Sequence, residues 1–189
     1  QVFGKILSHS LGEGGDQYPF LPLLPVPDLG QEVVHLALQH GHSADAAHPL
    51  MGPALYPPLA QMAGLGWLGT SGLIITPEHG PRVRLAAVLT NIEDLPFVTQ
   101  NDHAWIQDYC TSCGRCIREC PPQAIYPEPV HHENGQITCV DTEGCFPYFS
   151  DYYGCSVCIK VCPFNKTPYD KIRASFQRNK NASKMTDLR

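Results

Sequence analysis

Apolar residues recur at helical spacing in two short segments of the first half of the chain. Residues 31–40 interleave Val, Leu and Ala with Gln, Glu and His, and Gly41 follows them. This pattern predicts a helix that ends at the glycine. Residues 57–63 predict a second short helix, because their two prolines fall in the first turn, where a missing backbone donor is tolerated, and Gly64 then breaks it.

Two apolar runs without helical spacing come next. Residues 73–76 and 83–90 predict strands, and a Pro-Glu-His-Gly-Pro turn separates them. The second run is nearly all apolar, which is typical of a strand covered on both faces. Residues 91–101 form a polar connector. Up to about residue 105 the pattern therefore indicates an α+β fold.

The first 30 residues are rich in glycine and proline. Between Tyr18 and Pro27, proline alternates with large apolar residues. Proline in a helix interior removes a hydrogen-bond donor and clashes with the preceding turn. We therefore expect an extended arm that packs its apolar side chains on its own core or on a partner.

Two cysteine runs dominate the second half of the chain. The first has the spacing C-x2-C-x2-C-x3-C and ends at Pro121, and the second has the spacing C-x2-C-x3-C and ends at Pro163. The first matches the bacterial two-cluster ferredoxin run at every position, and the second matches its final part. This spacing favours iron–sulfur ligation over disulfides. Zinc is the main competing interpretation, but a third and a fourth thiolate at these spacings before proline are not its usual layout.

In two-cluster ferredoxins the fourth cysteine of each run ligates the other cluster. This rule predicts the ligands of cluster I as Cys110, Cys113, Cys116 and Cys162. It predicts three ligands of cluster II as Cys120, Cys155 and Cys158. One ligand of cluster II is therefore missing from the two runs.

Cys139 and Cys145 are the two candidates for the missing ligand. Cys145 is favoured, because it lies nearer the second run and a Phe-Pro-Tyr-Phe segment follows it. Cys139 falls in a predicted strand at residues 136–140, where a buried structural cysteine is the ordinary interpretation. Aromatic residues near the runs are expected to shield the clusters, and they are Phe146, Tyr148, Phe149, Tyr152, Tyr153 and Phe164.

Charge is distributed unevenly along the chain. The net charge is −5, and residues 166–189 hold seven basic and two acidic residues, a local balance of +5. Such a tail is suited to an acidic partner, a phosphate or a membrane surface, or it is a solvated terminus. No apolar stretch reaches the ~18 residues of a membrane-spanning helix. The first residue is Gln1 and no signal peptide is visible, so the localisation stays open.

A glycine motif and a group of histidines are two further candidates for binding sites. Residues 64–69 match G-x-G-x-x-G, but a helix precedes them and a strand follows, the reverse of a dinucleotide site. A glycine-rich helix-to-strand turn is the better interpretation. The histidines do not have the spacing of a standard metal site, and His131 and His132 are expected in an exposed loop. The clustered histidines are His35, His40, His42 and His48.

Two segments resemble the cobalamin-dependent reductases, namely the reductive dehalogenases and the related epoxyqueuosine reductases. Residues 63–91, which begin Ala-Gly-Leu-Gly-Trp-Leu-Gly-Thr-Ser-Gly, are similar to the segment before their ferredoxin module. Residues 145–165, which begin Cys-Phe-Pro-Tyr-Phe-Ser-Asp-Tyr-Tyr-Gly-Cys, are similar to the dehalogenases in particular. In that family a cysteine at the position of Cys145 completes the second cluster.

The resemblance implies an α+β fold in which a partial nitroreductase-like corrinoid domain precedes a two-cluster bacterial ferredoxin-like module. We expect the proline-rich arm and partial domain over residues 1–105, the double [4Fe–4S] module over 106–165, and a helix and basic tail over 166–189. It also implies a corrinoid (cobalamin) that performs the chemistry while the clusters recharge it.

Two departures from the family pattern are visible. The chain is expected to be shortened on its N-terminal side, where family members carry much of the corrinoid and substrate pocket. Residues 49–56 contain no acid where epoxyqueuosine reductases carry a proton donor, which weakens the interpretation as a tRNA-modifying enzyme. The remaining weak catalytic candidates are Tyr56 as a proton donor and Arg82 or Arg84 as a stabilising cation.

The sequence thus predicts an iron–sulfur electron-transfer protein that passes single electrons through two [4Fe–4S] clusters to a corrinoid or a partner redox site. The alternative is an electron-transfer subunit of a larger complex that has lost the corrinoid and the catalytic activity. Its partners would be redox proteins, reached through the proline-rich arm and the basic tail, and nucleic acid is not expected.

Overall fold

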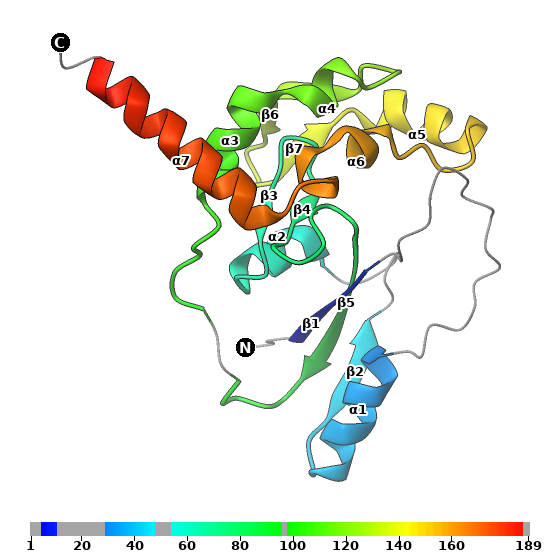
Figure 1. The fold of residues 1–189 in the computed structure, drawn as a ribbon. Helices are drawn as coiled ribbons and strands as arrows, with labels where there is room; N and C mark the ends of the chain where they lie inside the picture. The colour runs from blue at the N-terminus through cyan, green and yellow to red at the C-terminus, as the bar shows by residue number, and fades with distance from the viewer. Residues whose placement is uncertain (1–4, 11–28, 48–53, 96–97, 187–189) are drawn as a thin grey trace.

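The computed structural model describes residues 5–10, 29–47, 54–95 and 98–186 (Figure 1). The predicted proline-rich arm between Tyr18 and Pro27, and His48, lie outside these residues. A three-stranded antiparallel sheet has the order β1 (Lys5–Ser10), β5 (Val83–Thr90), β2 (Ala44–Ala47). The predicted strand at 83–90 is therefore confirmed as the central strand of this sheet, whereas β1 and β2 were not predicted.

Both helices predicted in the first half are present. Helix α1 spans Leu29–Gln39, and Gly41 ends it in the left-handed region at φ 80°. Helix α2 spans Tyr56–Met62 with its prolines in the first turn, and Gly64 follows with φ 72°. Glycine adopts this conformation without a steric penalty, which explains why each helix stops there.

The glycine-rich turn leads into a small two-stranded sheet. Strand β3 (Trp67–Leu68) pairs antiparallel with β4 (Ile74–Ile75), and a tight turn follows in which Thr76 and Gly80 exchange backbone hydrogen bonds of 2.9 and 3.0 Å. The predicted strand at 73–76 is thus confirmed at its centre. Helix α2 contacts both β5 and this sheet, and α3 contacts β3, so α2 and the small sheet connect the larger sheet to the cysteine-bearing helices (Figure 1).

The second half is built from short helices around one hairpin. In chain order its elements are α3 (Trp105–Cys113), α4 (Arg115–Arg118), β6 (Ile125–His131), β7 (Ile137–Val140), α5 (Thr142–Asp151), α6 (Val157–Val161), the 3-10 helix η1 (Pro163–Asn165) and α7 (Tyr169–Thr186).

Two sequence expectations for this half have different outcomes. The predicted strand around Cys139 is confirmed as β7. The predicted loop at His131 is wrong, because this residue ends β6 and pairs with Ile137. Both His131 and His132 are exposed, as expected.

One apolar cluster joins the two halves of the chain. Its fully buried members are Ile75, Ile106, Phe164, Tyr169 and Ile172, which come from β4, α3, η1 and α7. Trp105 packs at the centre of an aromatic group, with ring centroids 5.2 Å from Tyr169 and 5.8 Å from Phe164. Two cysteines, Cys110 and Cys162, pack against the same cluster. The described part of the chain contains no helix long and apolar enough to cross a membrane.

Candidate metal centre

Cysteines from both runs line one small hollow between the helices. Cys110 and Cys113 come from α3, Cys116 from α4, and Cys162 follows α6. Gly114 has φ 55° and separates α3 from α4, which turns the chain so that the third thiol faces the first two. Helix α4 packs against α6, and this contact brings the second run beside the first. The four sulfurs predicted for cluster I therefore share one hollow, which Cys158 also lines.

Backbone N–H groups point at several of these sulfurs. Burial raises the pKa of the Cys110 thiol to about 12, although the N–H of Thr70 stabilises its thiolate. Burial raises the pKa of Cys162 to about 11, although hydrogen bonds from the backbone of Phe164 and Asn165 act to lower it. Donors of this kind favour the charged sulfur, and a coordinated metal deprotonates a thiol outright.

A second group of thiols forms beside the first. Burial raises the pKa of Cys145, and the nearby Cys120 and Cys155 thiols add to that rise. Burial also raises the pKa of Cys158 to about 11, with contributions from Cys155, Cys116 and Cys145. The N–H of Ala124 donates to Cys120 Sγ at 3.4 Å. The four thiols of this group, Cys120, Cys145, Cys155 and Cys158, are an all-sulfur donor set of the kind that iron–sulfur clusters use.

Cys139 lies in a different environment. It is in β7, and a Cβ added at Gly72 would lie 3.2 Å from its Cβ and 3.7 Å from its Sγ. Burial alone raises its pKa, without a contribution from another thiol. The structure thus brings Cys145, and not Cys139, next to the second run.

The glycine-rich turn at residues 64–69 packs directly on the first group of thiols. A Cβ at Gly66 would overlap the carbonyl of Ile75, and a Cβ at Gly69 would lie 3.6 Å from Cys110 Sγ. Thr70 and Ser71 line the hollow itself. The predicted turn is present at residues 64–66, but Trp67 and Leu68 form strand β3, and sequence reasoning missed the role of the segment as one wall of the cysteine site. Its closely spaced glycines were the signal of a close backbone approach.

The expected aromatic shield is only partly present. Phe164 is 6% exposed and shields the first group of thiols. By contrast, Phe146 on α5 is 68% exposed, and Tyr153, just after α5, is 91% exposed. Sequence reasoning did not select Trp105, which packs against the same buried cluster as Cys110 and Cys162, or Tyr109, which lines the hollow together with them. They lie on α3 one to five residues before Cys110, so their position on the ligand-bearing helix was the available signal.

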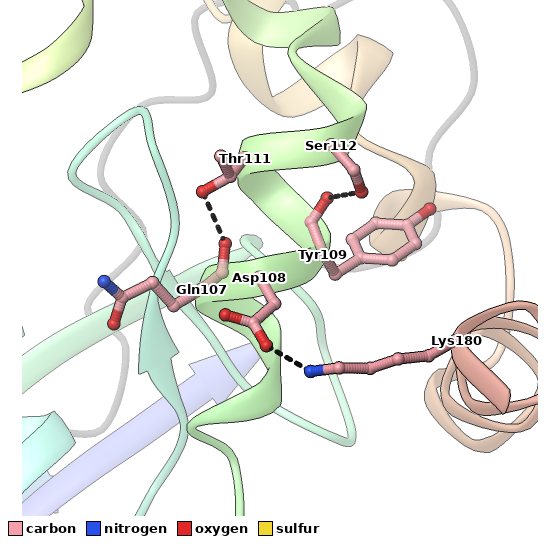
Figure 2. A network of polar contacts seen from close by, with 6 residues as sticks. All are labelled: Gln107, Asp108, Tyr109, Thr111, Ser112 and Lys180. Atoms are coloured by element: carbon pink, nitrogen blue, oxygen red, sulfur yellow. Dashed lines mark hydrogen bonds and ion pairs between the residues drawn. The ribbon is translucent and has the colours of Figure 1, made fainter. Parts of the chain in front are cut away.

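Helix α3 is tethered to the C-terminal helix at its outer face (Figure 2). Lys180 Nζ lies 2.7 Å from Asp108 Oδ2, and both side chains are about half exposed. Further along α3, the hydroxyl of Thr111 donates to the carbonyl of Gln107 and that of Ser112 to the carbonyl of Tyr109, at 3.0 and 2.8 Å. A surface ion pair such as that between Lys180 and Asp108 contributes at most about 1 kcal/mol to stability.

The weak catalytic candidates do not line the two hollows beside the cysteine runs. Tyr56 is buried at the start of α2, and Arg84 is exposed on β5. The Nε of Arg82 is buried and has no hydrogen-bond partner within the described residues. In the same part of the chain, His, Cys, Asp and Glu side chains do not form a group of three placed to hold a single metal ion.

Comparison with known proteins identifies the cysteine region. The family described as the 4Fe-4S dicluster domain matches residues 109–166. This range contains all eight cysteines of the two thiol groups, and it also contains Cys139.

Curated relatives extend the similarity beyond the cysteines. The chain is 38% identical over 114 residues to the tetrachloroethene reductive dehalogenase of Sulfurospirillum multivorans, covering 55% of this chain and 22% of that protein. It is 35% identical over 124 residues to the epoxyqueuosine reductase of Bacillus anthracis, covering 57% of this chain and 29% of that protein. The chain therefore spans less than a third of the length of the curated relatives it matches.

Solved structures agree with this relationship. The catabolic reductive dehalogenase NpRdhA, in complex with 3-bromo-4-hydroxybenzoic acid, is 28% identical with a TM-score of 0.61, covering 75% of this chain and 21% of its own. A selenomethionine-labelled epoxyqueuosine reductase is 26% identical with a TM-score of 0.54, covering 74% of this chain and 38% of its own. The chain thus combines a 4Fe-4S dicluster domain with a mixed helix-and-strand fold, and it is similar in sequence and structure to parts of the reductive dehalogenases and epoxyqueuosine reductases.

Proposed function

We propose that this protein holds two [4Fe–4S] clusters and passes single electrons through them to a corrinoid or to a partner redox site. The observation that carries the proposal is the placement of cysteines from both runs around one hollow, with Cys120, Cys145 and Cys155 beside it. Cluster I would be held by Cys110, Cys113, Cys116 and Cys162. Cluster II would be held by Cys120, Cys145, Cys155 and Cys158.

The chain's own residues suit the storage of one electron at a time. When bound, such clusters supply one-electron oxidation and reduction, with potentials set by hydrogen bonds to sulfur and by exposure. The N–H groups of Thr70 and Phe164 would stabilise negative charge on the cluster I sulfurs. Tyr109 lines the hollow beside the thiols, and Trp105 packs on the apolar cluster that Cys110 and Cys162 also contact, so both would exclude water from that side.

One wall of the first thiol group indicates the direction of electron flow. The turn at residues 64–69 and the backbone of Thr70 belong to the α+β half, which we interpret as a partial nitroreductase-like corrinoid domain over residues 1–105. They contact the first thiol group directly. One structural relative is described as a dehalogenase with a B12-dependent mechanism. We infer that electrons leave cluster I toward this half, where a corrinoid would receive them, and that cluster II, which exchanges electrons with cluster I, is a second one-electron store.

Anaerobic electron counting tests the proposal. The reconstituted protein, reduced with excess dithionite and desalted, is mixed with cob(II)alamin while the cluster and corrinoid absorbance bands are followed. Delivery of about two electrons per chain, one from each cluster, is expected. Clusters that cannot be reduced would overturn the electron-transfer function. Reducible clusters in a protein that neither binds nor reduces the corrinoid would favour the alternative of an electron-transfer subunit without one.

A further inference from the structure

A broad, open hollow lies beside cluster I. It has a volume of about 690 Å³, and both Cys113 and Cys162 line it. Tyr109 and Ser112 contribute the α3 side of the wall, and Figure 2 shows both residues on this helix. Two of the four sulfurs proposed for cluster I thus border a hollow wide enough for side chains of another molecule.

Basic side chains surround this hollow. Arg115 comes from α4, Lys160 from α6 and Lys166 from the end of η1, and all three are exposed. Glu119 is the single acidic residue among the lining residues. Where the structure describes the side chains, the one ion pair joins Lys180 to Asp108, so none of the three cations around the hollow is held in an ion pair.

This local charge contrasts with the rest of the molecule. The whole chain has a net charge of −5. Residues 1–165, which include Arg115 and Lys160, have a balance of −10, and residues 166–189, which include Lys166, have a balance of +5. A basic hollow on an acidic body attracts a compact anionic surface that touches only the hollow. A long polyanion such as RNA would also meet the acidic remainder, which disfavours it.

We propose that this hollow is the docking surface through which a small acidic one-electron carrier protein delivers electrons to cluster I. The inference rests on the proposed function and names the class of partner. Carboxylates around the carrier's cofactor would face Arg115, Lys160 and Lys166, and the shortest route into the protein would run through Cys113 and Cys162. One electron leaves the reduced cofactor of the carrier and enters the cluster, and neither a bond nor an atom is transferred.

Binding of a flavodoxin, used as the acidic probe, tests the proposal on the reconstituted full chain. The double variant Lys160→Gln/Lys166→Gln removes two charges from the hollow. The matched control Lys171→Gln/Arg178→Gln removes two exposed charges from α7. We expect the hollow variant to bind oxidised flavodoxin about tenfold more weakly at low ionic strength and to be reduced more slowly by the reduced form. The affinity of the control variant for flavodoxin should stay within about twofold of the wild-type value. Wild-type binding should also weaken as salt is added, because salt shortens the Debye length from about 30 Å at 0.01 M.

Iron content and reduction by the methyl viologen radical cation are measured for every variant. The single variant Arg115→Gln supplies a second test if the double variant loses iron. A wild-type protein without iron, or without reduction by viologen, would refute the proposed function itself. If viologen reduces the protein, but the wild type, the hollow variant and the control variant bind flavodoxin equally or not at all, the docking surface alone would be refuted. Tight binding of an RNA stem-loop through the same cations, without flavodoxin binding, would also refute it.

Discussion

Single thiols decide which metal group this protein can hold. The cysteine runs are half-buried, and burial raises the pKa values of Cys110, Cys158 and Cys162 to between about 11 and 12 in the metal-free chain. Neutral thiols would therefore predominate at pH 7 without metal. Metal binding must then release protons, so loading should improve as the pH rises.

Replacement of Cys145 separates the two candidates for the missing ligand. We expect Cys145→Ser to bind about four fewer iron atoms per chain, because cluster II loses one of its four thiolates. Cys139→Ser is the matched control and should keep the full iron content, since its sulfur packs on Gly72. Colorimetric iron and sulfide analysis measures both variants. The reverse result would move the ligand to Cys139.

Tyr169 is the most heavily hydrogen-bonded aromatic residue in the core. Its hydroxyl lies 2.6 Å from His103 Nδ1 and accepts from Trp105 Nε1 at 2.9 Å. Tyr169→Phe leaves the partly buried Trp105 donor without this partner, which should cost about 1 kcal/mol. Thermal unfolding of the cluster-loaded protein should show a lower midpoint, whereas Tyr153→Phe, at a 91% exposed position, should not change it.

The same residue gives a pH dependence with a definite sign. Burial raises the pKa of Tyr169 above its ordinary value near 10, so the folded state holds this proton more tightly than the unfolded chain. That stability is present below pH 10 and is lost as the pH rises through the folded-state pKa. Above pH 10, the wild-type midpoint should fall more steeply with pH than that of Tyr169→Phe. Parallel slopes would contradict this assignment.

At the scale of elements, one turn joins the α+β half to the cysteine helices. Gly80 has φ 56°, and a Cβ there would overlap the carbonyl of Phe164 in η1. Gly135 has φ 81° with open space around it. Alanine at either position adds backbone strain of about 1–2 kcal/mol, but only Gly80→Ala also separates the turn from η1. We expect Gly80→Ala to unfold at a lower temperature than Gly135→Ala and to lose cluster absorbance faster in air. Equal behaviour of the two variants would argue against this contact.

The elements also show what the sequence could predict. The positions of glycines and prolines predicted the bounds of α1 and α2 closely, because these residues act through local backbone geometry. Strands β1 and β2 were missed, since their pairing depends on partners distant in the chain, such as Leu7 opposite Ala86. Strands β3 and β6 were also missed, although they pair with the neighbouring β4 and β7. Cysteine spacing predicted that Cys110, Cys113, Cys116 and Cys162 lie together, because fixed ligand geometry limits the choices, whereas the ligand sets of the two clusters stay a prediction. It could not reveal that Thr70 and Tyr109 form walls of the site, as tertiary packing brings them there. The division of the chain at residues 105 and 165 stays a prediction.

At the scale of the whole molecule, the two thiol groups interlock. Cys162 closes the first group from the second run, and Cys120 joins the second group from the first run. Because α4 and α6 pack against each other, loss of one crossing ligand should disturb both groups. We expect Cys162→Ser to retain fewer than about four iron atoms per chain, whereas Cys145→Ser retains about four. Retention of one intact cluster by Cys162→Ser, seen by electron paramagnetic resonance, would show that loss of this crossing ligand does not disturb the other cluster.

The central claim is that one chain holds two [4Fe–4S] clusters. Iron and acid-labile sulfide analysis of the anaerobically purified protein, with zinc measured in the same sample, tests it most directly. The claim predicts about eight iron and about eight sulfide per chain, with little zinc. About four iron would mean that the second thiol group does not hold a cluster, and zinc without sulfide would contradict the account altogether.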